Sequence, residues 1–385
     1  RGVYRTRNGG ETWEKVLFIH ENVGIIDMVI NRDDPQILYA AAYEKYRYPW
    51  HFEAGGPESG IYKTMDGGDT WSRLGGGLPG GNVGRIGIDL FRSDPYIIYA
   101  VVENLNPKPD YEIPEEDLAF DPLRDPYFDR LIGGELYRSA DAGASWTKMN
   151  HDTVDVGSKA AYSFNQILVD PMDDNYLYIN NISLQSSKDQ GRTWDGIPWD
   201  KRERFHTMFG DVRTLWINPE DPRHIMAGSD GGLNVSWDRG QTTMCYYQIP
   251  LGEIYNIEVD DAVPYNIYAG LQDHEGWKAP SNGWMGSVGD DDWVLIGMWD
   301  GMYLKVDPEN NRWLYTTTQF GAHQRVDQLT GERVNIQPSA AEGEPPYRYT
   351  WNTPLIISPH NSRILYTGGQ MLLRSVDMGD NWQKI

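Results

Sequence analysis

Three acidic residues of this sequence are candidates for catalysis. Asp211, Glu253 and Asp292 each precede a short apolar stretch, so a fold that gathers those stretches around one axis would bring their carboxylates together. Hydrolysis of a glycosidic bond uses two carboxyl groups, about 5–5.5 Å apart in retaining enzymes and about 6.5–9.5 Å apart in inverting ones. The three residues are therefore candidate catalytic groups, although a chain with 56 acidic residues also places some carboxylates together by chance.

Polar and aromatic residues at equivalent places indicate a binding site. They lie at the beginning of other apolar stretches or in the loops beside them: Asp27, Arg85, Gln166, Arg213, Tyr255, Asp273, Trp293, Arg348, Trp351 and Asn352. A ring of carboxylates, guanidinium groups and aromatic rings suits a polar ligand such as a sugar chain or a peptide. In the alternative interpretation, these side chains satisfy one another around a water-filled channel.

Other kinds of chemistry lack the residues that they need. The eight His residues show no HExxH motif or other metal-ligand spacing. The glycine-rich stretch Gly75–Gly84 lacks the Lys-Ser/Thr pair of a phosphate-binding loop. The acidic stretch 110–121 could hold Ca²⁺ through its oxygen atoms, with a solvated run of charge as the alternative. We predict no other metal and no cofactor.

Composition excludes several classes of protein. The chain has 385 residues, with 34 Lys and Arg against 56 Asp and Glu, and a formal net charge of −22. A nucleic-acid-binding protein needs a basic face to neutralise phosphates, so the charge argues against that class. No apolar run approaches the length of a membrane span. The single cysteine, Cys245, excludes a disulfide framework.

A short box recurs along the chain. A Ser or Thr is followed by Asp or Asn two positions later, by Gly two later, and then by Thr or Ser and Trp. The copies are Thr6–Trp13, Thr64–Trp71, Ser139–Trp146 and Ser187–Trp194, with degenerate copies at Ser236–Thr243 and Ser375–Trp382. The acid can accept hydrogen bonds from the turn, Gly supplies positive φ, and Trp can pack between sheets. These structural roles are assigned to Asp66, Trp71, Asp141, Trp146, Asp189, Trp194, Asp377 and Trp382.

A second repeated pattern predicts the fold. An apolar strand, a polar turn and an apolar-Tyr-small strand recur, with markers at Tyr39, Tyr99, Tyr178, Met226, Tyr268, Tyr315 and Tyr366. Together with the boxes they define seven units of four antiparallel strands, over roughly 21–74, 83–149, 162–197, 210–248, 252–287, 292–335 and 350–385. One such unit cannot bury both of its faces, so the units are expected to close radially. The prediction is an all-β, seven-bladed β-propeller.

The domain organisation follows from the same count. Residues 19–385 form the predicted propeller, and residues 1–18 are left over as a hairpin of an incomplete or preceding blade. Either missing sequence completes this blade, or a second propeller of the same parent chain precedes it.

The boxes resemble the Asp-box, or bacterial neuraminidase repeat, of sialidases, xyloglucanase-type glycoside hydrolases and sortilin-type receptor domains. The stretches RGVYRTRNGGETWEKVLF, GPESGIYKTMDGGDTW, GGLNVSWDRGQTT and YRYTWNTPLIISPHNSRILYTGG are similar to large bacterial proteins labelled glycosyl hydrolase or sortilin-like repeat protein. This resemblance covers essentially the whole chain. It implies the propeller fold, whereas hydrolases, receptors and assembly factors all carry the box.

Long connections point to one end of the predicted blades. Residues 43–60 and 103–134 join second to third strands, and residues 197–210 and 335–350 join one blade to the next. Loops gathered at one end of a rigid scaffold commonly form a binding surface. The leading hypothesis is therefore an exported bacterial module, secreted, periplasmic or at the cell surface, that binds polysaccharide or polypeptide. The alternatives are an endo-acting glycoside hydrolase and a structural module of a cell-surface assembly.

Overall fold

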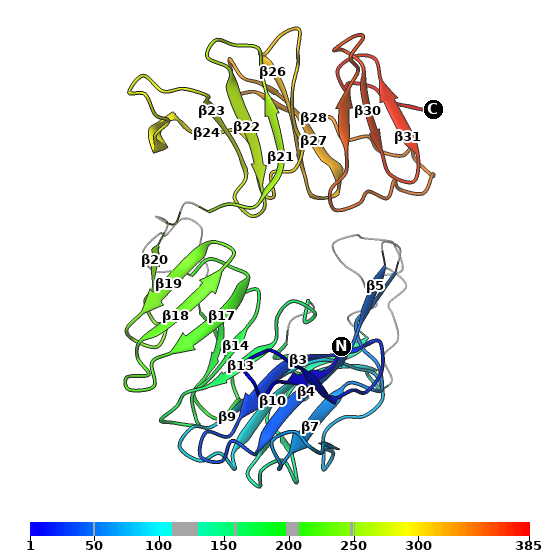
Figure 1. Ribbon diagram of the computed structural model, residues 1–385. Coiled ribbons are helices and arrows are strands. Elements are labelled where there is room, and N and C mark those ends of the chain that lie inside the picture. The colour runs from blue at the N-terminus through cyan, green and yellow to red at the C-terminus, as the bar shows by residue number, and fades with distance from the viewer. Residues whose placement is uncertain (49–50, 110–129, 158–159, 198–207, 247–248, 250) are drawn as a thin grey trace. The chain divides into compact units, whose positions relative to one another are not determined.

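The computed structural model describes residues 1–48, 51–109, 130–157, 160–197, 208–246, 249 and 251–385. The chain forms two compact units, unit 1 over Arg1–Ile249 and unit 2 over Pro250–Ile385. Both are built from antiparallel β-sheets (Figure 1), which confirms the all-β prediction. Among the described residues, no helix is long and apolar enough to cross a membrane.

Unit 1 contains four four-stranded sheets within its described residues, numbered here sheets 1 to 4 in chain order. Sheet 1 comprises β3 (Val23–Ile30), β4 (Leu38–Glu44), β7 (Gly60–Thr64) and β8 (Ser72–Arg73). Sheet 2 comprises β9 (Val83–Leu90), β10 (Ile98–Pro107), β11 (Leu131–Ser139) and β12 (Thr147–Lys148). Sheet 3 comprises β13 (Gln166–Val169), β14 (Leu177–Asn180), β15 (Gln185–Ser187) and β16 (Asp195–Gly196). Sheet 4 comprises β17 (Val212–Ile217), β18 (Ile225–Ser229), β19 (Gly232–Ser236) and β20 (Met244–Tyr246).

In residues 251–385, unit 2 contains three more four-stranded sheets, numbered 5 to 7. Sheet 5 comprises β21 (Ile254–Val259), β22 (Asn266–Leu271), β23 (Gly276–Pro280) and β24 (Val294–Leu295). Sheet 6 comprises β25 (Leu304–Val306), β26 (Trp313–Thr318), β27 (Ala322–Asp327) and β28 (Arg333–Asn335). Sheet 7 comprises β29 (Leu355–Ile357), β30 (Leu365–Gly368), β31 (Leu372–Ser375) and β32 (Gln383–Lys384). Short 3₁₀ turns, η2 (Asp290–Asp292) and η3 (Gln319–Gly321), lie before β24 and before β27.

Sheets 1 to 3 of unit 1 and sheets 5 to 7 of unit 2 pack with their first strands adjacent, and β17 of sheet 4 lies against β14 of sheet 3. In unit 1, β9 lies against both β3 and β13, and in unit 2, β25 lies against β21 and β29. Figure 1 shows this arrangement in unit 1, where consecutive sheets fan out from neighbouring first strands. Such stacking of four-stranded antiparallel sheets is typical of β-propellers. The closed seven-bladed propeller over 19–385 stays a prediction.

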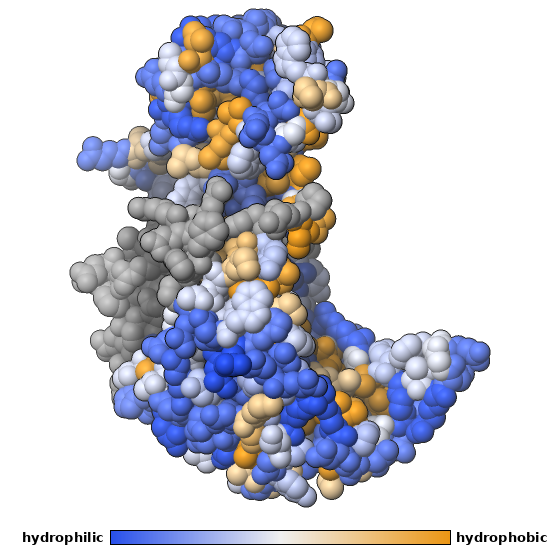
Figure 2. Space-filling view, turned by 90° about the vertical axis from the view of Figure 1, so that its left-hand side faces the viewer, coloured by the Kyte–Doolittle hydropathy of each residue, from blue (hydrophilic) through white to orange (hydrophobic). Residues whose placement is uncertain are grey.

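Apolar side chains fill the spaces between neighbouring sheets. Ala40, Ala41 and Ala42 of β4 are fully buried, and β4 lies between β3 and β7 of its own sheet and also against β9 of sheet 2. One core cluster joins Tyr39 and Ile61 of sheet 1 to Ile86 of sheet 2. On the face seen in Figure 2, hydrophilic residues cover most of the surface and apolar residues form several smaller patches among them.

The box turns close on their own side chains. In Thr64–Trp71, the Thr64 hydroxyl donates to Asp66 at 2.7 Å and accepts the Gly68 N–H at 2.9 Å. The Asp66 carboxylate accepts the backbone N–H and the hydroxyl of Thr70, at 2.8 and 2.6 Å. These hydrogen bonds lower the pKa of Asp66 to about 2. The boxes that begin at Ser139, Ser187, Ser236 and Ser375 repeat the pattern.

The box tryptophans differ in burial. Trp146 is 6% exposed and packs in the core between sheets 1 and 2. Trp194 and Trp382 pack against the cores between sheets 2 and 3 and between sheets 6 and 7. Trp71 is half-buried, and Trp13 is 61% exposed.

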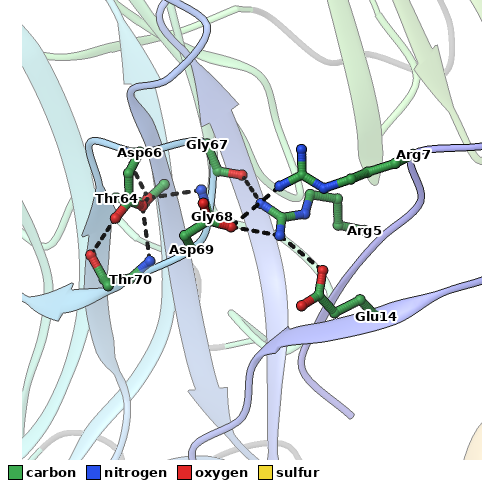
Figure 3. Close-up of polar contacts among 9 residues, drawn as sticks. All are labelled: Arg5, Arg7, Glu14, Thr64, Asp66, Gly67, Gly68, Asp69 and Thr70. Atoms are coloured by element: carbon green, nitrogen blue, oxygen red, sulfur yellow. Dashed lines mark hydrogen bonds and ion pairs between the residues drawn. The ribbon is translucent and has the colours of Figure 1, made fainter.

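The hairpin of β1 (Val3–Arg5) and β2 (Glu14–Leu17) contacts the box turn of sheet 1. Arg5 donates to the Gly67 carbonyl and pairs with Asp69 and Glu14, at 2.7, 2.7 and 2.9 Å (Figure 3). Arg7 pairs with the same Asp69 at 3.3 Å. The hairpin thus meets sheet 1 as a preceding sheet would, with its own box at Thr6–Trp13.

One predicted unit boundary is wrong. We expected residues 252–287 to hold the whole fifth sheet and residue 292 to open the sixth. Instead, Asp292 ends η2 and Trp293 leads into β24, the fourth strand of sheet 5. The fifth sheet lacks the box that joins the third strand to the fourth in most other sheets, so no motif in the sequence indicated where β23 ends and β24 begins. Sheet 6 begins only at Leu304.

Candidate ligand-binding site

Three cations meet at the loop end of unit 1, the end where second strands join third strands. Lys45 follows β4, Arg47 lies in β5 (Tyr46–Tyr48), and Arg85 lies near the beginning of β9. Burial lowers the pKa of Lys45, and repulsion from Arg85, Arg47 and Arg1 lowers it further. A protein with a net charge of −22 has therefore gathered positive charge at this place, where it attracts anionic groups.

Aromatic rings flank these cations. The Lys45 Nζ lies 5.5 Å from the ring centre of Phe52, in β6 (His51–Glu53), and 5.7 Å from that of Tyr162. The two rings meet edge to face with centres 5.1 Å apart. The Arg47 guanidinium lies 5.5 Å from the same Phe52 ring. Cations held against aromatic faces form a surface on which a chain ligand can both stack and pair.

Arg85 has hydrogen-bonding capacity that the described residues leave unused. Its Nη1 donates to the Tyr162 carbonyl at 3.4 Å, whereas its Nε is buried and has no hydrogen-bond partner among the described residues. Burial lowers the pKa of the guanidinium. A buried donor without a partner costs free energy, and an acceptor on a ligand would recover part of it.

A buried carboxyl group lies next to Arg85. Glu103 of β10 is 6% exposed and accepts the Arg85 backbone N–H at 3.0 Å. Burial raises the pKa of Glu103 to about 7. Glu103 belongs to no motif and stands beside Asn104 in the second half of β10, so sequence reasoning did not single it out.

Asp27 is a predicted ligand-binding residue, and both oxygens of its carboxylate accept hydrogen bonds from backbone N–H groups. One oxygen accepts the Ile88 N–H of the neighbouring first strand at 3.0 Å, and the other accepts the Met28 N–H at 2.9 Å. Asp89 repeats this link in the next sheet, accepting the Val169 N–H at 2.8 Å. Such carboxylates connect one first strand to the next, so the observed contacts of Asp27 stabilise the packing of sheets 1 and 2.

The other predicted residues of unit 1 make contacts at the start of sheets 3 and 4. Gln166 accepts a hydrogen bond from the Asn180 side chain at 3.0 Å. Arg213 pairs with Asp230 at 2.6 Å and with Asp211 at 3.3 Å, and its guanidinium lies 4.6 Å from the Phe164 ring centre. Asp211 has a φ of 57°, a left-handed conformation uncommon for a residue with a side chain.

Unit 2 brings together two of its predicted residues. The Trp351 Nε1 donates to the Tyr255 hydroxyl at 3.4 Å, and that hydroxyl donates to Gln272 at 3.2 Å. Trp351 also meets Phe320 edge to face, with ring centres 5.2 Å apart. Trp351 is 47% exposed, so this cluster offers an accessible aromatic surface.

The remaining predicted residues of unit 2 make local contacts of their own. The Asp273 N–H donates to Asp300 at 3.0 Å, and the Arg348 N–H donates to Gln370 at 2.6 Å. The Asn352 carbonyl accepts from the Thr350 hydroxyl at 3.3 Å. Glu253 precedes β21, and its carbonyl accepts the Gln272 N–H at 2.9 Å.

Asp292 and Trp293 are not placed as predicted, because they precede a fourth strand rather than a first one. The Asp292 carboxylate accepts the Gly289 N–H of its own turn at 2.9 Å. The predicted calcium-binding stretch 110–121 lies outside the described residues, as do Trp199, Arg204 and His206 of the 197–210 connection.

Comparison with known proteins finds no family model and no curated sequence that matches. Similar solved structures include "YCF48 bound to D1 peptide", with 13% identity, a TM-score of 0.36 and coverage of 92% of this chain and 94% of that one. YCF48 from Cyanidioschyzon merolae has 11% identity and a TM-score of 0.33, covering 94% and 98%. A GH74 enzyme from Niastella koreensis has 13% identity and a TM-score of 0.32, covering 99% of this chain. This chain spans 64% of that enzyme. Likenesses with TM-scores this low carry no argument about function.

Proposed function

We propose that this chain is a recognition protein that binds a polysaccharide or a polypeptide at the loop end of unit 1. The observation that carries the proposal is the cluster of Lys45, Arg47 and Arg85 against the rings of Phe52 and Tyr162. Cations supply charge-assisted hydrogen bonds and the rings supply flat apolar area. Both are groups that bind an extended polar chain without reacting with it.

The geometry of the carboxylates favours binding over catalysis. Asp211 pairs with Arg213, and Asp292 accepts a hydrogen bond within its own turn. Glycoside hydrolysis requires two carboxyl groups that face one substrate, and neither contact provides that arrangement.

Glycoside hydrolysis is the second candidate function because of one specific observation. The pKa of Glu103 is raised to about 7 by burial, which is the range that a general acid needs at neutral pH. Its 6% exposure and its bond to the Arg85 N–H argue against contact with substrate. Release of reducing ends that disappears in Glu103→Gln, Asp211→Asn or Asp292→Asn would establish hydrolysis.

Binding arrays test the leading proposal. We expect the protein to bind members of a glycan array or a peptide array, and Arg85→Ala to weaken that binding at least about tenfold, since one charge-assisted hydrogen bond contributes about 1.5–3 kcal/mol. Arg7→Ala, which removes an exposed cation of the hairpin, is the matched control and should bind as the unchanged protein does. The proposal would be overturned, in favour of a structural module, if the protein bound no member of either array or if both variants lost the same amount of binding.

Wider features belong to the same proposal. They are a seven-bladed closed propeller with Asp-box turns, export from a bacterial cell, and a second propeller in the parent chain. The proposal includes no cofactor, and the acidic stretch 110–121 is taken as a solvated run of charge, with Ca²⁺ binding as its alternative.

A further inference from the structure

A tyrosine and a cation face each other in most of the sheets. Tyr39 on the second strand of sheet 1 is paired in register with Lys63 on the third, and Tyr99 is paired with Arg138 in sheet 2. The pairs Tyr268 with Lys278, Tyr315 with Arg325, and Tyr366 with Arg374 repeat this in sheets 5, 6 and 7. In sheets 1 and 2, the cation lies 5.4 and 5.7 Å from the tyrosine ring centre.

Each of these pairs in sheets 1 and 2 also binds the neighbouring sheet. The Tyr39 hydroxyl and the Lys63 ammonium both donate to the Ala142 carbonyl of sheet 2, at 3.1 and 2.9 Å. In sheet 2, Arg138 donates to the Tyr99 hydroxyl and pairs with Asp174 of sheet 3, at 3.0 and 2.9 Å. The cation therefore fills the space beside the ring and satisfies the polar groups around it.

Sheet 3 departs from this arrangement. Tyr178 is paired in register with Ser186, whose side chain is too short to replace Lys or Arg. Tyr178 is 1% exposed, and its hydroxyl is buried with no hydrogen-bond partner among the described residues. An unsatisfied buried hydroxyl is costly, and the Tyr315 hydroxyl of sheet 6 is likewise without a partner among the described residues. Sheet 3 therefore differs from its counterparts in lacking a cation beside the tyrosine ring.

A cleft occupies the space beside Ser186. It has a volume of about 270 Å³ and includes Tyr176, Tyr178, Ser186, Lys188, Trp237 and Arg239 among its lining residues. Pockets for drug-sized ligands measure about 300–1,000 Å³, so this cleft has room for about one ring. Arg239 is held in place by Asp170 at 3.0 Å and lies 4.3 Å from the Tyr176 ring centre.

One wall of the cleft is a rigid, exposed indole. Trp237 is 55% exposed and stacks on His224, with ring centres 5.5 Å apart and an angle of 6° between the planes. Trp216 also contacts His224, edge to face, with ring centres 5.5 Å apart. A supported aromatic face loses little conformational entropy when a flat apolar group packs on it.

We infer that this cleft between sheets 3 and 4 binds one pyranose ring of a saccharide. A pyranose has an apolar face of C–H groups that can stack on Trp237, and hydroxyls that can pair with hydrogen-bond donors. Lys188 and Arg239 supply such donors around the cleft, and Asp170 accepts from two nitrogen atoms of the Arg239 guanidinium and so holds it in place. The site is separate from the Lys45–Arg85 cluster, so it does not rest on the proposed function.

Restoring the missing cation provides the test. The probes are methyl α-D-glucopyranoside, methyl β-D-galactopyranoside and sodium D-glucuronate, each observed by saturation-transfer NMR with the full chain. We expect transfer to at least one probe, and Ser186→Arg to abolish it by filling the cleft as Arg138 does in sheet 2. Trp237→Ala should weaken binding of the same probe at least about tenfold.

Two controls separate this site from other surfaces. Trp13→Ala removes an exposed indole of the hairpin and should not change the transfer. Ser186→Arg and Trp237→Ala are also measured in an Arg85→Ala background, which weakens any transfer that comes from the proposed recognition site. Circular dichroism checks that Ser186→Arg folds, and Trp237→Ala, at an exposed position, keeps the test informative if it does not. The inference is overturned if no probe shows transfer, or if transfer in the Arg85→Ala background is unchanged by a folded Ser186→Arg substitution.

Discussion

Buried titratable residues make the stability of this protein depend on pH. His323 of β27 is fully buried, and its two ring nitrogens contact the hydroxyls of Thr317 and Thr367, at 2.9 and 2.8 Å. Burial lowers the pKa of His323 to about 4. The imidazole is therefore neutral in the folded protein at pH values where it is protonated in the unfolded chain.

This pKa shift predicts a loss of stability in acid. Because the folded pKa lies below the unfolded value of about 6.5, the stabilisation is complete above pH 6.5 and is lost as pH falls toward 4. The loss approaches about 1.4 kcal/mol per pH unit, or about 2 kcal/mol between pH 7 and pH 5. Hydrogen exchange of β26 and β27 should show it, after correction for the intrinsic rate. His323→Gln should remove this pH dependence, and an unchanged slope in that variant would contradict the assignment.

At the scale of the elements, packing between sheets is the main source of stability. Trp146 fills the core between sheets 1 and 2 and donates to the Gly143 carbonyl at 3.2 Å. The box turn thereby anchors one sheet against the next. Trp13 occupies the same place in its own box but is 61% exposed.

Truncating these two tryptophans should have unequal effects. Trp146→Ala leaves a cavity in the core and should lower the free energy of unfolding by roughly 3–5 kcal/mol. Trp13→Ala should change it by no more than about 0.5 kcal/mol. Urea titration followed by circular dichroism measures both. Equal midpoints for Trp146→Ala and the unchanged protein would refute the packing role.

The repeats made the elements predictable, whereas the site depended on contacts between distant residues. Strand periodicity and the boxes located most strands, because turn chemistry and alternation act within a few residues. Sheet 5, which lacks a box, was misjudged between Pro280 and Val294. The meeting of Lys45 with Arg85 and Tyr162 depends on the packing of three successive sheets, which no local pattern records. The Tyr178–Ser186 exception is visible in the sequence only after the register of the strands is known.

At the scale of the whole molecule, the two units carry buried groups of opposite pH response. In unit 1, burial raises the pKa of Asp89 to about 7 and that of Glu103 to about 7. Their folded pKa values lie above the unfolded ones of about 3.8 and 4.5, so the stability of unit 1 falls as pH rises from about 4 to 7. His323 of unit 2 acts in the opposite direction over the same interval. The box carboxylates, with pKa values of about 2 for Asp66 and Asp141, act below this interval.

Acidification from pH 7 to pH 5 should therefore change the stability of the two units in opposite directions. Hydrogen exchange, corrected for intrinsic rates, should become slower in β9 and β13 and faster in β26 and β27. Asp89→Asn should reduce the change in unit 1 without altering unit 2, and His323→Gln should do the converse. Changes of the same sign in both units would show that these buried groups do not control the response.

The long ladder of sheet 2 has a practical consequence for protein engineering. Strands β10 and β11 stay paired from Ile98 and Ser139 to Asn104 and Gly133, and after a shift in register Pro107 is paired with Leu131. A foreign peptide inserted between those two residues would have its ends held in register by the host's own hydrogen bonds. Insertions succeed where the flanking backbone is secured and the added segment can remain on the surface. The paired residues Pro107 and Leu131 are therefore suitable attachment points for an epitope or an affinity tag that replaces the residues between them.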